Sequence, residues 1–66
     1  MYALDGRKIR ELIMSRTLSV NEFAKAAGLH PLTVRRILRG NRANIKTVGT
    51  IASFFDIDGN ELIVEE

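Results

Sequence analysis

Cysteine and tryptophan are absent from the sequence, and the chain has one histidine and one proline. Without cysteine there is no disulfide framework and no thiolate nucleophile, which is compatible with a reducing cytoplasm. No apolar run approaches the roughly 20 residues that cross a bilayer, and no signal-peptide pattern opens the chain. We therefore expect a soluble cytoplasmic protein that has no membrane partner.

The residue types that carry enzymatic chemistry are also scarce. There is a single histidine, and the sequence shows neither a glycine-rich phosphate loop nor two carboxylates that the fold would pair in a cleft. The spacing of Asp56, Asp58 and Asn60 hints at a calcium loop, but Gly59 stands in the wrong place and the distal glutamate is missing. We expect no enzyme, no metal site, no cofactor and no small-molecule ligand.

Acidic residues are missing from the whole middle of the chain. Between Glu22 and Asp56 there are six lysines and arginines and no aspartate or glutamate, whereas residues 56–66 form an acidic C-terminal segment. This asymmetry favours a protein that presents one face to a polyanion. The alternative is that the charges only solvate the surface, as most charge runs do.

At 66 residues the chain forms one small domain, near the lower limit at which a core alone maintains a fold. Its central stretch, residues 19–40, has the punctuation of two short helices that meet at a tight corner. Ser19 and Glu22 match a capping box at the start of the first helix, and Gly28 can end it in a left-handed conformation. Pro31 fits the first position of the second helix, because a missing N–H is no loss there.

The second of these helices has one apolar and one cationic side. Helical spacing places on its inward face Val34, Ile37 and Leu38. The outward face carries Leu32, Arg35, Arg36 and Arg39. Three arginines on the exposed side of one helix favour contact with a polyanion over a merely solvated surface.

One further helix is expected on each side of this pair. Asp5 can cap a helix that runs from about Gly6 to Arg16, in which Met14 is half-exposed. Its buried stripe is Ile9, Leu12 and Ile13. Asn44 can cap a fourth helix, with Phe54 off its apolar stripe and exposed. That stripe is Ile45, Val48, Ile51, Ala52 and Phe55.

The central pair closely resembles the helix-turn-helix of phage repressor and Cro-type DNA-binding domains. The resemblance rests on the small Ala24, on Gly28 in the turn and on the helix end at residues 37–40. The matching apolar positions are Phe23, Ala27, Leu29, Val34 and Ile37. It implies an all-α fold, a compact five-helix lambda-repressor-like domain over residues 1–66 with the motif at helices 2 and 3. The alternative is a generic helical hairpin that uses alanine and glycine only for packing.

The last segment has two interpretations. Asp58 and Glu61 match a capping box for a brief fifth helix around residues 59–63. Asp58-Gly59 is also a good two-residue turn for a β-hairpin. The resemblance favours the helix.

The sequence departs from the resembled family at two positions together. Where the family commonly has a buried arginine and glutamate pair, this chain has Ile13 and Leu38. Replacing a buried ion pair by two apolar residues is often neutral or stabilising. We therefore predict that Ile13 and Leu38 touch.

The resemblance also assigns contacts with DNA. The early residues of the second crossing helix reach base edges in the major groove. These base-reading positions are Pro31, Leu32, Thr33, Arg35 and Arg36. For Leu32 a plain surface or partly buried leucine is the alternative. The family often has glutamine or another polar residue near Val20, Pro31 and Leu32, so the operator sequence is not predictable here.

The resemblance also implies a second set of residues that hold phosphates, at the helix starts and loops where the family binds them. They are Ser19, Asn21, His30, Arg39, Asn41, Arg42, Asn44 and Lys46. For the three cations at 39, 42 and 46 the alternative role is solubility alone, and for His30 it is that of an exposed turn residue or a weak cap.

The resemblance implies a bacterial or phage-encoded transcription regulator that binds double-stranded DNA sequence-specifically and acts as a repressor. A homodimer on two half-sites about 34 Å apart is the expected working form. The candidate dimer interface is Phe54, Ile57, Ile63 and Val64. These residues could instead merely complete the core. The alternative function is a protein-interaction module on the same fold, such as an antitoxin or adaptor, in which the arginines dock an acidic surface.

Overall fold

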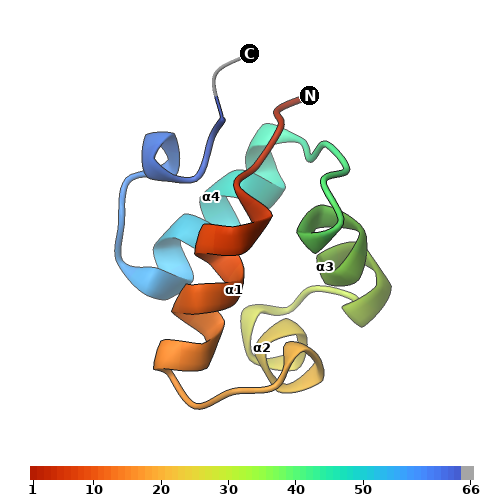
Figure 1. Ribbon diagram of the computed structural model, residues 1–66, viewed down its shortest axis with the longest axis vertical. Helices are drawn as coiled ribbons and strands as arrows, with labels where there is room; N and C mark the ends of the chain where they lie inside the picture. The colour runs from red at the N-terminus through yellow and green to blue at the C-terminus, as the bar shows by residue number, and fades with distance from the viewer. Residues whose placement is uncertain (65–66) are drawn as a thin grey trace.

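A computed structural model describes residues 1–64 and shows an all-helical domain (Figure 1). α2 contacts α3 and α4, and α3 also contacts α1. The elements are α1 (Gly6–Ser15), α2 (Val20–Ala27), α3 (Pro31–Leu38), α4 (Ile45–Phe55) and a 3₁₀ turn, η1 (Gly59–Glu61). The expected four helices are present, and Glu65 and Glu66 of the acidic segment lie outside the described residues.

The helices begin where the sequence supplies caps. The side chain of Asp5 accepts a hydrogen bond from the amide of Lys8 at the start of α1. The side chain of Asn44 accepts one from the amide of Thr47 at the start of α4. Such side-chain acceptors satisfy amides that have no partner inside the helix. The predicted helix starts are therefore confirmed.

The core is made of the apolar stripes of all four helices together with Leu4, Ala43 and Leu62. Met14 is exposed, more fully than expected, and Phe54 is half-buried rather than exposed. The ring of Phe54 meets that of Phe23 edge-on with 5.0 Å between centroids, and Phe55 stacks on Phe23 at 5.3 Å. The guanidinium of Arg16 lies 5.8 and 5.5 Å from the centroids of Phe54 and Phe55. Phe23 and Arg16 together therefore cover part of Phe54.

Ile45 does not belong to the buried stripe of α4, because 59% of its surface is exposed. It is the first residue of the helix, and the buried positions begin one turn later at Val48. The expectation that Ile45 faces the core was therefore wrong.

The predicted fifth helix is only the three-residue 3₁₀ turn η1. Its capping box forms as expected between Asp58 and Glu61. The helix stops because the chain then becomes extended: Ile63 forms an antiparallel bridge with Leu4, and the amide of Val64 donates to the carbonyl of Ala3 over 2.8 Å. Within residues 1–64 there is no strand longer than an isolated bridge, so the β-hairpin interpretation was also wrong.

Residues 1–5 are held in place by this pairing. Tyr2 bridges to Ala43 before α4, and the side chain of Leu4 is 4% exposed. Gly6 then brings the start of α1 against the end of α3, since a β-carbon at Gly6 would lie 2.7 Å from the carbonyl oxygen of Leu38. Leu38 packs on the core cluster that includes Ile13. Direct contact between these two side chains stays a prediction.

Candidate nucleic-acid interface

The corner between α2 and α3 is built by four consecutive residues, 28–31. Gly28 has φ 76° and ψ 25°, the left-handed conformation that most residues adopt only at a cost. The amide of Leu29 donates to the carbonyl of Ala24 over 2.8 Å, which closes the end of α2. His30 then caps α3, because its Nδ1 accepts a hydrogen bond from the amide of Leu32 at 3.1 Å, and Pro31 occupies the first helical position. The predicted corner is confirmed.

The two faces of α3 differ as the spacing predicts. Val34 and Ile37 are 0% and 2% exposed, and Leu38 is partly buried. Leu32 is 45% exposed. The exposed face also carries Thr33, Arg35, Arg36 and Arg39. Buried valine and isoleucine on one side of α3 thus turn its arginines outward.

Arg35 points toward α2. Its Nη2 donates to Oδ1 of Asn21 over 2.9 Å, and both side chains are exposed. This hydrogen bond joins the two helices of the corner across their outer surface. Nothing in the spacing of the sequence signals it, because the two residues are 14 positions apart and belong to separate helices.

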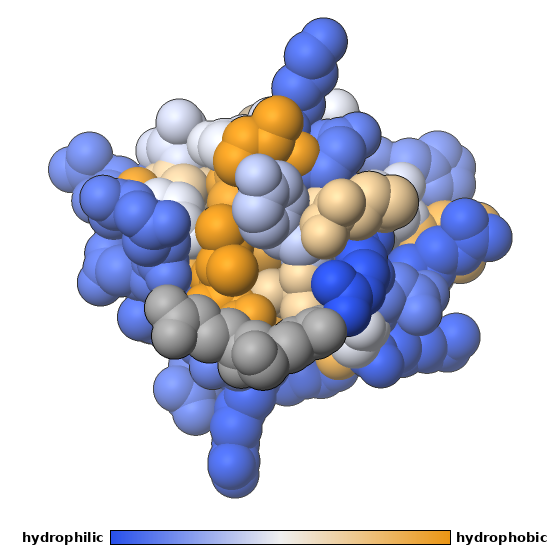
Figure 2. Space-filling model, turned by 90° about the horizontal axis from the view of Figure 1, so that it is seen from above, coloured by the Kyte–Doolittle hydropathy of each residue, from blue (hydrophilic) through white to orange (hydrophobic). Residues whose placement is uncertain are grey.

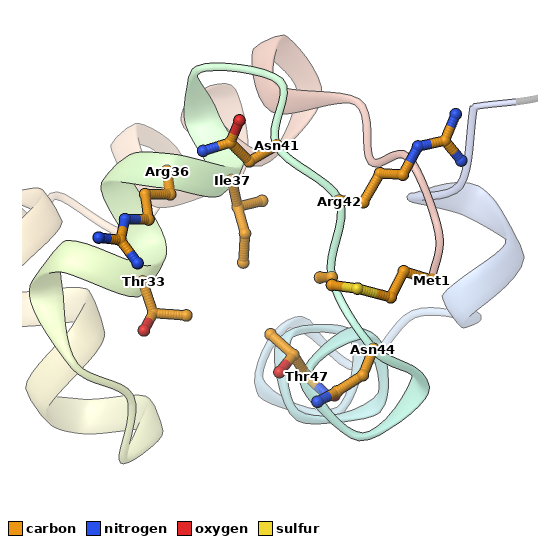
Figure 3. A pocket seen from close by; sticks show the side chains of 9 residues that line it. Met1, Thr33, Arg36, Ile37, Asn41, Arg42, Asn44 and Thr47 are labelled. Carbon is orange, nitrogen blue, oxygen red and sulfur yellow. The ribbon is translucent and has the colours of Figure 1, made fainter.

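Arg36 lies beside a hollow of about 310 Å³ between α3 and the start of α4 (Figure 3). Thr33 and Ile37 line it from α3, and Asn44 and Thr47 line it from the start of α4. The remaining lining residues are Met1, Asn41, Arg42 and Ala43. Figure 3 shows the side chain of Arg42 directed away from this hollow. Sequence reasoning had assigned no role to Thr47, although Asn44 as a helix cap places it in the first turn of α4.

Three of the predicted phosphate contacts accept a hydrogen bond as helix caps and retain a side-chain donor for another partner. Ser19 Oγ accepts from the amide of Glu22 at 3.1 Å, which leaves the hydroxyl proton for another acceptor. His30 uses Nδ1 and keeps Nε2, while Asn44 uses Oδ1 and keeps its amide nitrogen. All three side chains are exposed. Each can therefore cap its helix and donate to an anion at once.

Glu22 is the acidic residue in the first turn of α2. Its carboxylate accepts from the amide of Ser19 over 2.9 Å. This hydrogen bond, with a smaller contribution from the Ser19 side chain, lowers the pKa of Glu22 below its ordinary value. Glu22 is thus held charged by the capping box.

The remaining predicted phosphate contacts lie at the end of α3, in the loop after it and at the start of α4. Arg39 is the residue that ends α3, and the amide of Asn41 after it donates to the carbonyl of Arg36 over 3.0 Å. Lys46 is the second residue of α4. The side chains of Arg39, Asn41, Arg42 and Lys46 are exposed.

The four residues expected at a dimer interface are not equally accessible. Phe54, Ile57 and Ile63 are partly buried and pack on the core, whereas Val64 is 44% exposed. Figure 2 shows hydrophobic side chains on the end of the molecule that carries both termini. Met1, Tyr2 and Val64 are exposed apolar residues of the two terminal segments, and Ile45 is exposed at the start of α4.

α2 and α3 are joined by a short turn that contains Gly28, and α3 has one buried side and one side with exposed arginines. This arrangement defines a helix-turn-helix domain. A helix-turn-helix family model matches residues 7–62, and the chain belongs to the XRE, or Cro/C1-type, helix-turn-helix family. This is a family of DNA-binding domains. The comparison with curated proteins gave no match. Within residues 1–64 no helix is long and apolar enough to cross a membrane, and no three potential metal ligands are grouped.

Proposed function

We propose that this protein is a small transcription regulator, a repressor, that binds double-stranded DNA sequence-specifically through α3. The observation that carries the proposal is the placement of the exposed face of α3. Arg35 contacts the first turn of α2, and Arg36 lines a hollow with the first turn of α4. The cationic face of α3 therefore stands between two helix starts, whose free amides and dipoles favour phosphates.

Base reading is proposed for the outermost residues of α3. Arg36 can donate two hydrogen bonds to O6 and N7 of a guanine, a contact that provides about 1 to 3 kcal/mol of discrimination. The methyl groups of Leu32 and Thr33 can pack on a thymine methyl group. Pro31 starts the helix at the edge of this surface.

Phosphate contacts are proposed for the polar residues that flank this face. Ser19, His30 and Asn44 donate through the side-chain donors that capping does not use. Charge is supplied by Arg39, Arg42 and Lys46. These contacts fix the position of the protein on the duplex and contribute no sequence preference of their own.

The proposed working form is a homodimer on two half-sites about 34 Å apart, because a single domain of this size buries little surface on DNA. Within the expected interface, Val64 is the residue most open to a partner.

The test is selection of bound sequences from random duplex DNA, followed by titration of three variants. Arg36→Ala should reduce affinity for the selected duplex to that for random DNA, which is a loss of about tenfold or more. Lys46→Ala should weaken both duplexes equally and lower the salt slope by about one. Arg10→Ala, which removes an exposed arginine from α1 outside the proposed interface, is the matched control and should preserve the preference.

Two results would contradict the proposal. The first is equal loss on selected and random DNA for both Arg36→Ala and Lys46→Ala. The second is the lack of any steep salt-dependent binding to duplex DNA, which would favour a module that docks a protein partner. Both variants remove exposed side chains, so their folding can be verified by circular dichroism.

A further inference from the structure

Arg35 and Arg36 are neighbours in the chain, yet the structure places them on different sides of the exposed face of α3. Arg35 is hydrogen-bonded to Asn21 in α2. Arg36 is among the residues that line the hollow between α3 and the start of α4, and Figure 3 shows its guanidinium turned away from α4. Consecutive residues of an α-helix are rotated by about 100°, which accounts for the division. The two arginines therefore meet different parts of a duplex that lies against α3.

Arg35 is hydrogen-bonded to α2, the first helix of the motif. In a helix-turn-helix complex this first helix crosses the DNA backbone. A guanidinium fixed against α2 is thus directed toward the edge of the groove, where the phosphates are. Arg36 has no such tie to α2 and lies beside Thr33, one turn earlier on the same side of α3. The positions of the two side chains therefore favour a contact with the DNA backbone for Arg35 and a contact with a base for Arg36.

The hydrogen bond to Asn21 leaves Arg35 suited to an anion. Arginine has five N–H donors, of which the contact with Oδ1 of Asn21 uses one. The others can bind two oxygens of a phosphate in the parallel arrangement that arginine favours. The carboxylate of Glu22, the acidic residue next to Asn21 in the chain, accepts a hydrogen bond from the amide of Ser19.

We propose that Arg35 binds a backbone phosphate and that Asn21 is the residue that positions it, so that Arg36 is the one member of the arginine pair that reads a base. This inference rests on the proposed DNA-binding function and revises the expectation that both arginines read bases. It assigns to Asn21 a role toward Arg35 in addition to its place at a helix start.

The experiment uses the duplex enriched by selection and a random-sequence duplex of equal length, each titrated at several salt concentrations. Arg35→Ala should weaken binding to both duplexes by the same factor, about tenfold, and reduce the salt slope by about 0.9. The ratio of the two affinities should stay within about twofold of the original. Arg36→Ala, in contrast, should abolish the ratio.

Asn21→Ala tests the positioning role. It should weaken both duplexes by about threefold, as expected for loss of one exposed hydrogen bond that orders a charged group. The same change in an Arg35→Ala background should have no further effect. Arg35→Lys should retain the salt slope, because it keeps the charge, while losing the sensitivity to Asn21→Ala.

The possible failures are distinguishable. If Arg35→Ala reduces only binding to the selected duplex, Arg35 reads a base and the inference is wrong while the proposed function stands. If Asn21→Ala and Arg35→Ala act independently, Asn21 does not position Arg35. If selection enriches no sequence, sequence-specific recognition fails, and the effect of Arg35→Ala on the salt slope with random DNA still decides its phosphate role. If the protein binds neither duplex, both proposals fail.

Discussion

Gly6 and Gly49 are both glycines inside helices, in α1 and α4, but the chain around them differs. A β-carbon at Gly6 would lie 2.7 Å from the backbone oxygen of Leu38 and 3.1 Å from its Cα, whereas one at Gly49 would have no neighbour within 4 Å. At position 6 glycine permits α1 to approach the end of α3. At position 49 it only adds freedom to the unfolded chain. The same residue is thus required by packing in one helix and dispensable in the other.

The largest effect is expected for Gly6→Ala. The added methyl group meets backbone atoms of Leu38 rather than a flexible side chain, so α1 must move away from α3. We expect a loss of about 2 to 3 kcal/mol in the free energy of unfolding, measured by urea denaturation. A loss below about 0.5 kcal/mol would show that the two helices separate easily and would remove the contrast with Gly49.

Gly28→Ala tests a position at which the backbone conformation, and not packing, determines the loss of stability. Gly28 has φ 76° and open space around its Cα, so an alanine has no steric neighbour but must adopt a left-handed conformation. We expect a loss of about 1 to 2 kcal/mol, which corresponds to a fall in melting temperature of roughly 4 to 16 °C for a domain of this size. Gly28→Asn should lose less, since asparagine tolerates this conformation. Equal losses for alanine and asparagine would point to another cause.

Gly49→Ala should have the opposite sign. The position is exposed and in the interior of α4, where alanine favours the helix by about 1 kcal/mol over glycine. We expect a gain of that size in a thermal or urea melt, with DNA binding unchanged. A destabilised Gly49→Ala variant would mean that Gly49 also serves a packing need.

The smallest effect on stability is expected for Glu22→Gln, which tests whether the start of α2 depends on a charge. The pKa of Glu22 is lowered from 4.5 by its hydrogen bonds with Ser19, the backbone amide first. Its charged form therefore stabilises α2 above that pH, and the contribution is lost as the pH falls through the lowered value. Glu22→Gln should be less stable than the original at pH 7 and equal to it in acid, as measured by urea denaturation at both pH values. A difference that does not change with pH would exclude the charge as its source.

Local features of this fold could be predicted from the sequence. Asp5, Ser19 and Asn44 cap their helices through contacts within three residues, and Gly28 and Pro31 shape the corner through their own backbone preferences. Such determinants act at short range, so a single sequence shows them. The outward direction of the arginines of α3 followed from helical spacing alone.

Features that depend on the distant chain could not be predicted. Phe54 is covered because Arg16 and Phe23 reach it from other elements, and η1 ends because Ile63 pairs with Leu4. The link between Asn21 and Arg35 likewise joins two helices. Each contact depends on which segments lie side by side in the fold, and the spacing of residues along the chain does not indicate these neighbours.

The extended segment before α1 has neighbours on both of its edges. Tyr2 exchanges two backbone hydrogen bonds with Ala43, of 2.8 and 2.9 Å, while Asp5 and Ala3 are bonded to Leu62 and Val64. Residues 2–5 are therefore hydrogen-bonded both to the loop that lines the hollow beside Arg36 and to the last described residues of the chain. Displacement of residues 2–5 would break the backbone hydrogen bonds of the loop and of the last described residues at the same time.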